Sequence, residues 1–197
     1  MPFRARPRRA DHANASRNRH TDPMRIYVPA TVDELDAVTV TGDEAVWSLA
    51  PRAAHAVTSA LSRELPDEDE EGLEFAAALE AADDSLALIA GRVGAPRQRL
   101  VVTVEVPDEM VALTQPGDDE SADDLAPSAV DVTASIPEVR IVCVHVDEPE
   151  AARDIAEVFA AADEDRDEDL DAALDRVSER DLLWYDWSEL KSVPRAK

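Results

Sequence analysis

Two consecutive stretches of sequence decide the fold: Glu74-Phe-Ala-Ala-Ala-Leu-Glu-Ala-Ala-Asp-Asp-Ser-Leu-Ala-Leu-Ile-Ala90 and Leu100-Val-Val-Thr-Val-Glu-Val106. Apolar residues of the first stretch recur at steps of three and four, which predicts a helix over about residues 69–92 with one buried face. The second stretch is β-branched and ends at Pro107, which predicts a buried strand. A core-packing helix against a sheet is therefore expected. The residues predicted to form its buried face are Phe75, Leu79, Ala82, Leu86, Ile89 and Val93.

Shorter elements are expected on both sides of this pair. Two predicted helix starts carry capping residues: Thr31 with Glu34 as a capping box, and Asp147 as an N-cap with Pro149 in the first turn. Pro29 is expected to end the first strand, because proline cannot donate to a sheet ladder. The remaining expected strands are 25–28, 54–58, 129–134, 139–146 and 182–185, and the remaining helices are 32–38, 59–65, 147–162 and 167–178.

These elements predict one α+β domain at residues 24–190. Its sheet is expected to be mixed and roughly six-stranded, with helices on one face. The strand-to-helix junctions near residues 28–34 and 144–150 resemble each other, as two duplicated βαβ-type halves would. An acidic loop is expected at 114–128 and a frayed tail at 191–197.

The charge of the chain is unevenly placed. The 197 residues carry a net charge of −24. Residues 1–23 hold six arginines and two acids, a net charge of +4, so the remainder carries −28. The basic segment has no apolar run, so it cannot be a secretory signal. We expect a disordered tail upstream of a true start at Met24, with a transit peptide or a nucleic-acid-binding arm as alternatives.

Charge and composition exclude several classes of function for the domain. Its acidity repels phosphate, so nucleic acid and anionic membranes are not expected partners. No apolar run approaches the ~20 residues of a membrane-spanning helix. The single cysteine, Cys143, cannot form an internal disulfide and suits a reducing cytoplasm, where its flanking valines predict a buried, inert thiol. A cytoplasmic location is therefore expected.

An acidic run at residues 163–171 resembles a calcium-binding loop between two helices. It places aspartates at the first, third and fifth positions of such a loop, but Glu168 stands where a glycine is needed and Leu174 where a bidentate glutamate is needed. No glycine-rich phosphate loop, nucleophile elbow or Cys-x-x-Cys pair occurs either. We therefore expect no metal and no cofactor.

Three residues are candidates for acid–base chemistry. His145 and Asp147 would share one side of a strand, a spacing that a general base and its orienting acid could use. His55 lies on another expected strand, and one strand-borne histidine is more often a packed residue than a catalyst. The expected ligand-binding residues lie near strand ends or in the aromatic cluster, where Trp184 and Tyr185 must point to opposite faces: Tyr27, Thr58, Trp184 and Tyr185.

Four segments in this order resemble a family of small, uncharacterised actinobacterial proteins. They are Met24-Arg-Ile-Tyr-Val-Pro-Ala-Thr31, Ala54-His-Ala-Val-Thr58, Val144-His-Val-Asp147 and Leu182-Leu-Trp-Tyr185. The resemblance covers residues 24–197 and implies that Met24 is the original start. It implies no reaction, cofactor or catalytic residue.

These observations favour a cytoplasmic protein without catalytic activity that acts through protein contacts, by self-association or by binding a basic partner. Acidic clusters at 67–71, 118–124 and 163–171 motivate this hypothesis. The alternative is an enzyme or small-ligand-binding protein, with or without Mg²⁺, whose His/carboxylate pocket lies at strand ends. The two hypotheses differ in whether histidines converge in one cleft with carboxylates. The pocket residues of the alternative are Tyr27, His55, Thr58, His145 and Asp147.

Overall fold

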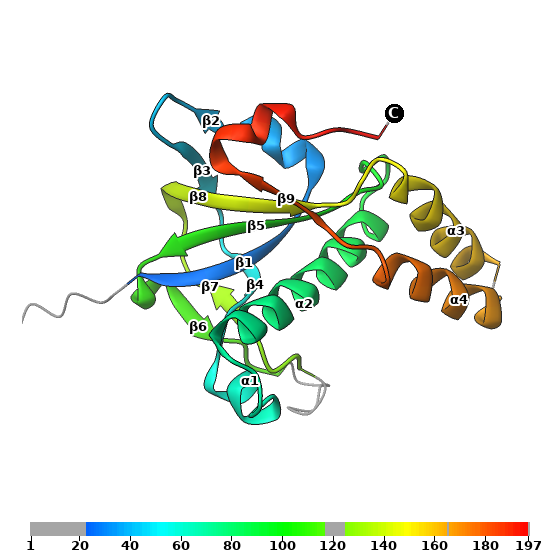
Figure 1. The fold of residues 1–197 in the computed structure, drawn as a ribbon, viewed down its shortest axis with the longest axis horizontal. Helices are drawn as coiled ribbons and strands as arrows, with labels where there is room; N and C mark the ends of the chain where they lie inside the picture. Colours follow the sequence, from blue (N-terminus) through cyan, green and yellow to red (C-terminus); the bar gives the residue numbers. More distant parts are fainter. Residues whose placement is uncertain (1–22, 117–124, 165, 197) are drawn as a thin grey trace, which may run out of the picture.

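The computed structural model describes residues 23–116, 125–164 and 166–196. Nine strands form one sheet (Figure 1). They are β1 (Met24–Thr31), β2 (Thr39–Val40), β3 (Ala45–Leu49), β4 (Arg52–His55), β5 (Arg99–Val106), β6 (Val111–Leu113), β7 (Ala129–Val132), β8 (Ile136–Val146) and β9 (Leu183–Asp186). Their order is β2-β3-β8-β5-β1-β4-β7-β6, and β9 also pairs with β8. The prediction of a single domain of the α+β class is confirmed.

The sheet differs from the expected one in strand number and in direction. All strand pairs that the structure describes are antiparallel. The predictions of a six-stranded mixed sheet and of βαβ-type halves are therefore wrong, because a βαβ unit requires parallel strands. The similar junctions instead lead into a short 3-10 helix in one case and into a long helix in the other.

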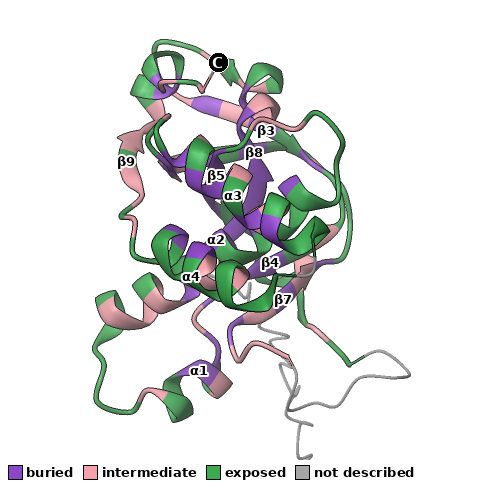
Figure 2. Cartoon of the chain, turned by 90° about the vertical axis from the view of Figure 1, so that its right-hand side faces the viewer, coloured by how far each residue is buried: buried purple, intermediate pink, exposed green. Residues whose placement is uncertain are grey.

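The helices cover the sheet unequally. They are α1 (Ser59–Glu64), α2 (Glu70–Ala90), α3 (Ala151–Asp163) and α4 (Asp167–Ser178), with 3-10 helices η1 (Val32–Ala37), η2 (Asp108–Met110) and η4 (Trp187–Ser192). The long helix α2 crosses one face, while η1 and η4 add buried residues to the cluster on the other face. The helices α3 and α4 pack as a pair to one side, and buried residues concentrate on the strands (Figure 2).

The buried face of α2 is only partly the one predicted, since Ala82 and Ile89 are buried as expected. Phe75, Leu79 and Val93 are exposed, whereas the buried side consists mainly of small residues. Small side chains let the helix approach the sheet closely. On this side of α2, the Ser85 hydroxyl donates to the carbonyl of Ala30 at 2.7 Å and accepts from the N–H of Leu100 at 2.9 Å. The buried residues are Ala77, Ala78, Ala81, Ala82, Ser85 and Ile89.

Pro29 lies inside β1 rather than at its end. It stands opposite Val101 in the β1–β5 pairing, which continues to Thr31. On the other side of β1, only Tyr27 has a Cα partner on β4, namely His55. The carbonyl of Pro29 instead accepts from Arg52 Nη2 at 2.6 Å. The missing N–H of proline therefore limits one ladder and leaves the other intact.

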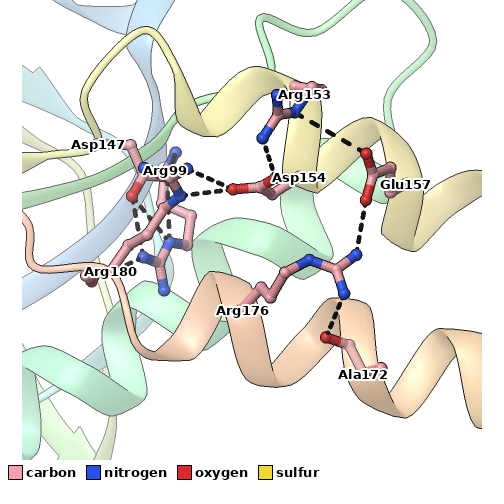
Figure 3. Close-up of polar contacts among 8 residues, drawn as sticks. All are labelled: Arg99, Asp147, Arg153, Asp154, Glu157, Ala172, Arg176 and Arg180. Atoms are coloured by element: carbon pink, nitrogen blue, oxygen red, sulfur yellow. Dashed lines mark hydrogen bonds and ion pairs between the residues drawn. The ribbon is translucent and has the colours of Figure 1, made fainter.

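A polar network joins the α3–α4 pair to the sheet (Figure 3). Asp147 is expected to cap the helix α3, but its carboxylate instead binds the guanidinium of Arg99, with Nη2 to Oδ1 at 2.9 Å. Arg180 donates through Nε to Asp154 at 2.7 Å. This hydrogen bond is the main cause that lowers the pKa of Asp154. The cap prediction for Asp147 is wrong, because the buried cation takes its carboxylate.

The described part of the predicted frayed tail, residues 191–196, packs against the fold. Val193 is buried, and the N–H of Ala196 donates to Gln98 Oε1 at 2.6 Å. Arg195 also pairs with Asp36 at 2.9 Å. Among the other expected segments, residues 1–22, most of the acidic loop at 117–124, and Asp165 of the acidic run lie outside the described residues.

Candidate functional site

A groove of about 950 Å³ runs between α2 and the strands β8 and β9. We call it the α2 groove. The helix α2 lies over β1, β4 and β5 and leaves the same face of β8 and β9 uncovered, so the groove follows from the position of the helix on a wide sheet. It is lined by Arg25, Tyr27, Asp69, Glu71, Gly72, Glu74, Phe75, Ala78, Leu79, Thr103, Val142, Cys143, His145, Ser178, Arg180, Asp181, Leu182 and Trp184.

The floor of the groove is built by strand register. Tyr27 stands opposite Thr103, and Thr103 opposite Cys143, so these three residues form one row across β1, β5 and β8. In the next row, His145 stands opposite Trp184 of β9. Residues two apart on a strand share a face, so both rows face α2. The structure thus brings together three of the predicted site residues, Tyr27, His145 and Trp184.

Two polar atoms of this floor lack hydrogen-bond partners. Thr103 Oγ1 and His145 Nδ1 are buried and unpartnered, and Thr114 Oγ1 is the third such side-chain atom among the described residues. Thr103 is only 2% exposed. A buried polar group without a partner costs about 1–3 kcal/mol, so two of them in one hollow mark a place where a ligand could supply bonds.

Large apolar side chains stand along the rim of the groove. Phe75 and Leu79 on α2 are 64% and 44% exposed, and Trp184 on β9 is 57% exposed. Aromatic and aliphatic residues around a hollow are typical of binding surfaces. Alternation on β9 places Tyr185 on the opposite face, where it packs against the main core cluster. The prediction that one of the two aromatic residues faces the core is confirmed.

Charged groups at the two ends of the groove are mostly paired. Arg25 binds Glu74 at 3.1 Å and Glu105 at 3.3 Å. Arg180 binds the buried Asp154. Glu71 and Asp181, by contrast, make no ion pair within the described part of the chain. The unneutralised charge of the groove is therefore negative.

Two floor residues have perturbed protonation. Burial, followed by the charge of Glu74, raises the pKa of the Tyr27 hydroxyl. Burial lowers the pKa of His145. Both residues are therefore neutral at pH 7, and the floor of the groove carries no charge of its own.

The hypothesised acid–base pair is not formed. Asp147 is fully buried against Arg99, so it does not orient His145, whose Nδ1 has no partner. His55 also lies elsewhere, because β1 and β5 stand between its strand β4 and β8. The structure therefore does not bring the two histidines into one cleft.

His55 lies between a serine and an aspartate, as in the catalytic triad of a hydrolase, but the solvent exposure of the serine and of the aspartate is the reverse of what a hydrolase needs. Its Nδ1 lies 2.7 Å from Ser128 Oγ, and its Nε2 lies 3.1 Å from Asp84 Oδ2. A hydrolase exposes the serine and buries the acid. Here Ser128 is fully buried and the Asp84 side chain is 51% exposed. The arrangement therefore ties β4, α2 and the start of β7 together.

The other predicted ligand-binding residue, Thr58, caps a helix. Its hydroxyl accepts from the N–H groups of Ala60 and Leu61 at the start of α1 and donates to the carbonyl of Pro127. It lies outside both hollows that flank α2. Its bonding capacity is used within the fold, so it is not available to a ligand in this arrangement.

A smaller hollow of about 520 Å³ lies on the other side of α2. Its charged groups are already paired: Arg52 with Glu34 at 2.7 Å, and Arg92 with Asp33. The described residues contain no group of three or more His, Cys, Asp or Glu placed to hold a metal ion. The α2 groove is therefore the stronger candidate site.

Fold and site together define a small α+β domain with an open, acidic, apolar-rimmed groove. The chain belongs to a family of unknown function (DUF6912), whose sequence pattern matches residues 24–193. No curated protein and no solved structure matches the chain significantly. Among the described residues, no helix has both the length and the apolar character that crossing a membrane requires.

Proposed function

We propose that this protein is a non-catalytic binding module whose α2 groove receives a basic, amphipathic segment of a partner protein. The observation that carries the proposal is the rim of Phe75, Leu79 and Trp184, three large apolar side chains exposed around one hollow. A segment with apolar residues on one side would cover them, and basic residues on the other would meet the acidic surroundings.

Charge selects a basic partner over a second copy of the chain. Residues 24–197 carry a net charge of −28. The groove adds the unpaired carboxylates of Glu71 and Asp181. Two copies meeting at this surface would bring like charges together, whereas a basic segment would be steered toward it.

The separation of His55 from His145 supports binding rather than catalysis. The enzyme hypothesis needs the histidines and a carboxylate in one cleft, but the carboxylate of Asp147 is held by Arg99 and that of Asp84 by His55. In the groove, His145 Nδ1 has no hydrogen-bond partner among the described residues, so no carboxylate orients the ring through that atom.

Two leucines of α2 allow a matched test. Leu79 lines the α2 groove and is 44% exposed, whereas Leu88 lies on the other side of the same helix and is 40% exposed. A random peptide library displayed on phage is selected against the full chain, and the enriched peptides are measured against Leu79→Asn and Leu88→Asn. We expect amphipathic basic peptides that bind Leu79→Asn about tenfold more weakly and Leu88→Asn unchanged.

The two variants carry the same charge and the same substitution, so attraction to the acidic surface alone would affect them equally. Equal binding to Leu79→Asn and Leu88→Asn, or a selection without enriched peptides, would refute the proposal. Dimerisation that Leu79→Asn abolishes in sedimentation would also refute it, and would assign the groove to self-association.

A further inference from the structure

Resting on the proposed function, we propose that the partner segment anchors itself by one lysine or arginine side chain, whose N–H groups bind Thr103 Oγ1 and His145 Nδ1 on the floor of the α2 groove. The two atoms belong to β5 and β8, which are neighbouring strands. His145 stands opposite Val101, two residues before Thr103, so the two side chains lie on the same face in adjacent rows.

The bonding capacity of the floor calls for a donor. A threonine hydroxyl has two lone pairs, and a neutral imidazole with its proton on Nε2 presents Nδ1 as its one acceptor. Burial lowers the pKa of His145, which keeps the ring neutral and preserves that acceptor at pH 7. Neither Thr103 Oγ1 nor His145 Nδ1 has a partner in the described structure. A side chain that ends in several N–H groups is able to serve both.

The surrounding charge selects a cationic donor. The arginines at the ends of the groove are neutralised, Arg25 by Glu74 and Glu105, and Arg180 by Asp154. The carboxylates of Glu71 and Asp181 are not neutralised by an ion pair within the described residues. A carboxylate or phosphate anchor would therefore meet repulsion here, whereas an ammonium or guanidinium group would meet attraction.

The rim accommodates the stem of such a side chain. Lysine and arginine carry apolar stems that pack along apolar surface while the charged end reaches polar groups. Phe75 and Leu79 stand on one side of the groove and Trp184 on the other. An exposed indole face also attracts a cation directly. The same groove thus provides contacts for the stem and the head of one residue.

The test uses the groove-dependent peptides from the selection. Each basic residue is replaced in turn by an uncharged residue of similar shape, lysine by norleucine and arginine by citrulline. One position is expected to stand out, with binding to the native chain about tenfold weaker after replacement. Against Thr103→Val, which keeps the shape of the side chain but removes the hydroxyl, that difference should shrink at least about threefold.

The outcomes separate this inference from the proposed function. A replacement effect that is equal in the native chain and in Thr103→Val would overturn the anchor and leave the groove as a docking site for a basic segment. Groove-dependent peptides without lysine or arginine would overturn both the anchor and the basic partner. Loss of groove dependence itself would overturn the proposed function. Circular dichroism of Thr103→Val establishes that the variant is folded, so a changed affinity is not caused by unfolding.

Discussion

Removing the carboxylate of Asp147 should lower the free energy of unfolding more than removing any carboxylate at the surface. The Asp147 side chain is fully buried, and it accepts from the backbone N–H of Arg99 at 2.8 Å and from Nη2 of the same residue at 2.9 Å. Arg99 is itself only 2% exposed. Both charges have therefore lost their hydration, and each depends on the other.

In Asp147→Ala the guanidinium keeps one other described hydrogen bond, from Nη2 to the carbonyl of Arg180 at 3.3 Å. Breaking one partner of a buried ion pair costs about 3–5 kcal/mol, because the remaining charge stays buried. For a domain of this size, each kcal/mol lowers the melting temperature by about 2–4 °C. The expected drop is therefore about 10 °C.

Thermal and urea unfolding followed by circular dichroism measure this effect. Asp33→Ala is the matched control, because Asp33 pairs with Arg92 at the surface, where an ion pair contributes about 1 kcal/mol or less. The double variant Arg99→Met with Asp147→Leu removes both charges and should recover much of the loss. An Asp147→Ala protein as stable as Asp33→Ala would refute the reasoning.

Three further predictions concern α2 and the groove floor. Ser85→Ala removes the bonds to Ala30 and Leu100 and should lower the free energy of unfolding by about 2 kcal/mol in urea, and an unchanged midpoint would contradict it. Thr103→Val replaces a buried, unpartnered hydroxyl by a methyl group and should raise that free energy by about 1 kcal/mol, whereas a lower midpoint would argue for an unseen bond. Burial lowers the pKa of His145 in the folded chain below that in the unfolded chain. As the pH drops below about 6.5, the unfolded chain therefore takes up a proton on His145 before the folded chain does, and the free energy of unfolding should fall. His145→Gln should remove that part of the slope in urea titrations at several pH values, and an unaltered slope would contradict the assignment.

Sequence patterns predicted the long strands β1, β5 and β8 and also the four-residue strands β4, β7 and β9. Alternation located β5 and β8 because both carry runs of valine and isoleucine. The strands β2, β3 and β6 were missed, since their short sequences show too little alternation to separate them from loops. Strand direction could not be read at all, because it depends on which strands pair across long connections.

The error on α2 has a different cause. Hydrophobic periodicity weights large side chains, so it selected Phe75 and Leu79 for the core. The helix instead buries alanines and Ser85 against the sheet, where close approach matters more than apolar area. Phe75 and Leu79, at the edge of the buried face, therefore stay exposed and line the groove. The sequence signal that could have revealed this buried face is the recurrence of small residues at steps of three and four along the helix, at Ala77, Ala78, Ala81, Ala82 and Ser85.

The candidate site could be predicted only in part. Tyr27, His145 and Trp184 were singled out as residues on strands or near strand ends, and the sheet order β8-β5-β1 brings them to one face. Thr103 was missed, although it interrupts a valine run with a polar residue. Asp147 was assigned to a helix cap because the sequence does not show that Arg99 lies beside it.

The proline within β1 leaves only a narrow pairing between two parts of the sheet. On one side, β1, β5, β8 and β3 share long ladders, whereas β4, β7 and β6 meet that block through the single pairing of Tyr27 with His55. A seam this narrow lets the smaller unit open while the larger block stays folded. Amide hydrogen exchange should therefore be faster in β4 and β7 than in β5. The ties across the seam are the bond of His55 to Asp84 on α2 and the bonds of Arg52 to the Pro29 carbonyl and to Glu34. A histidine that resembles a catalytic one thus helps to hold the two parts of the sheet together.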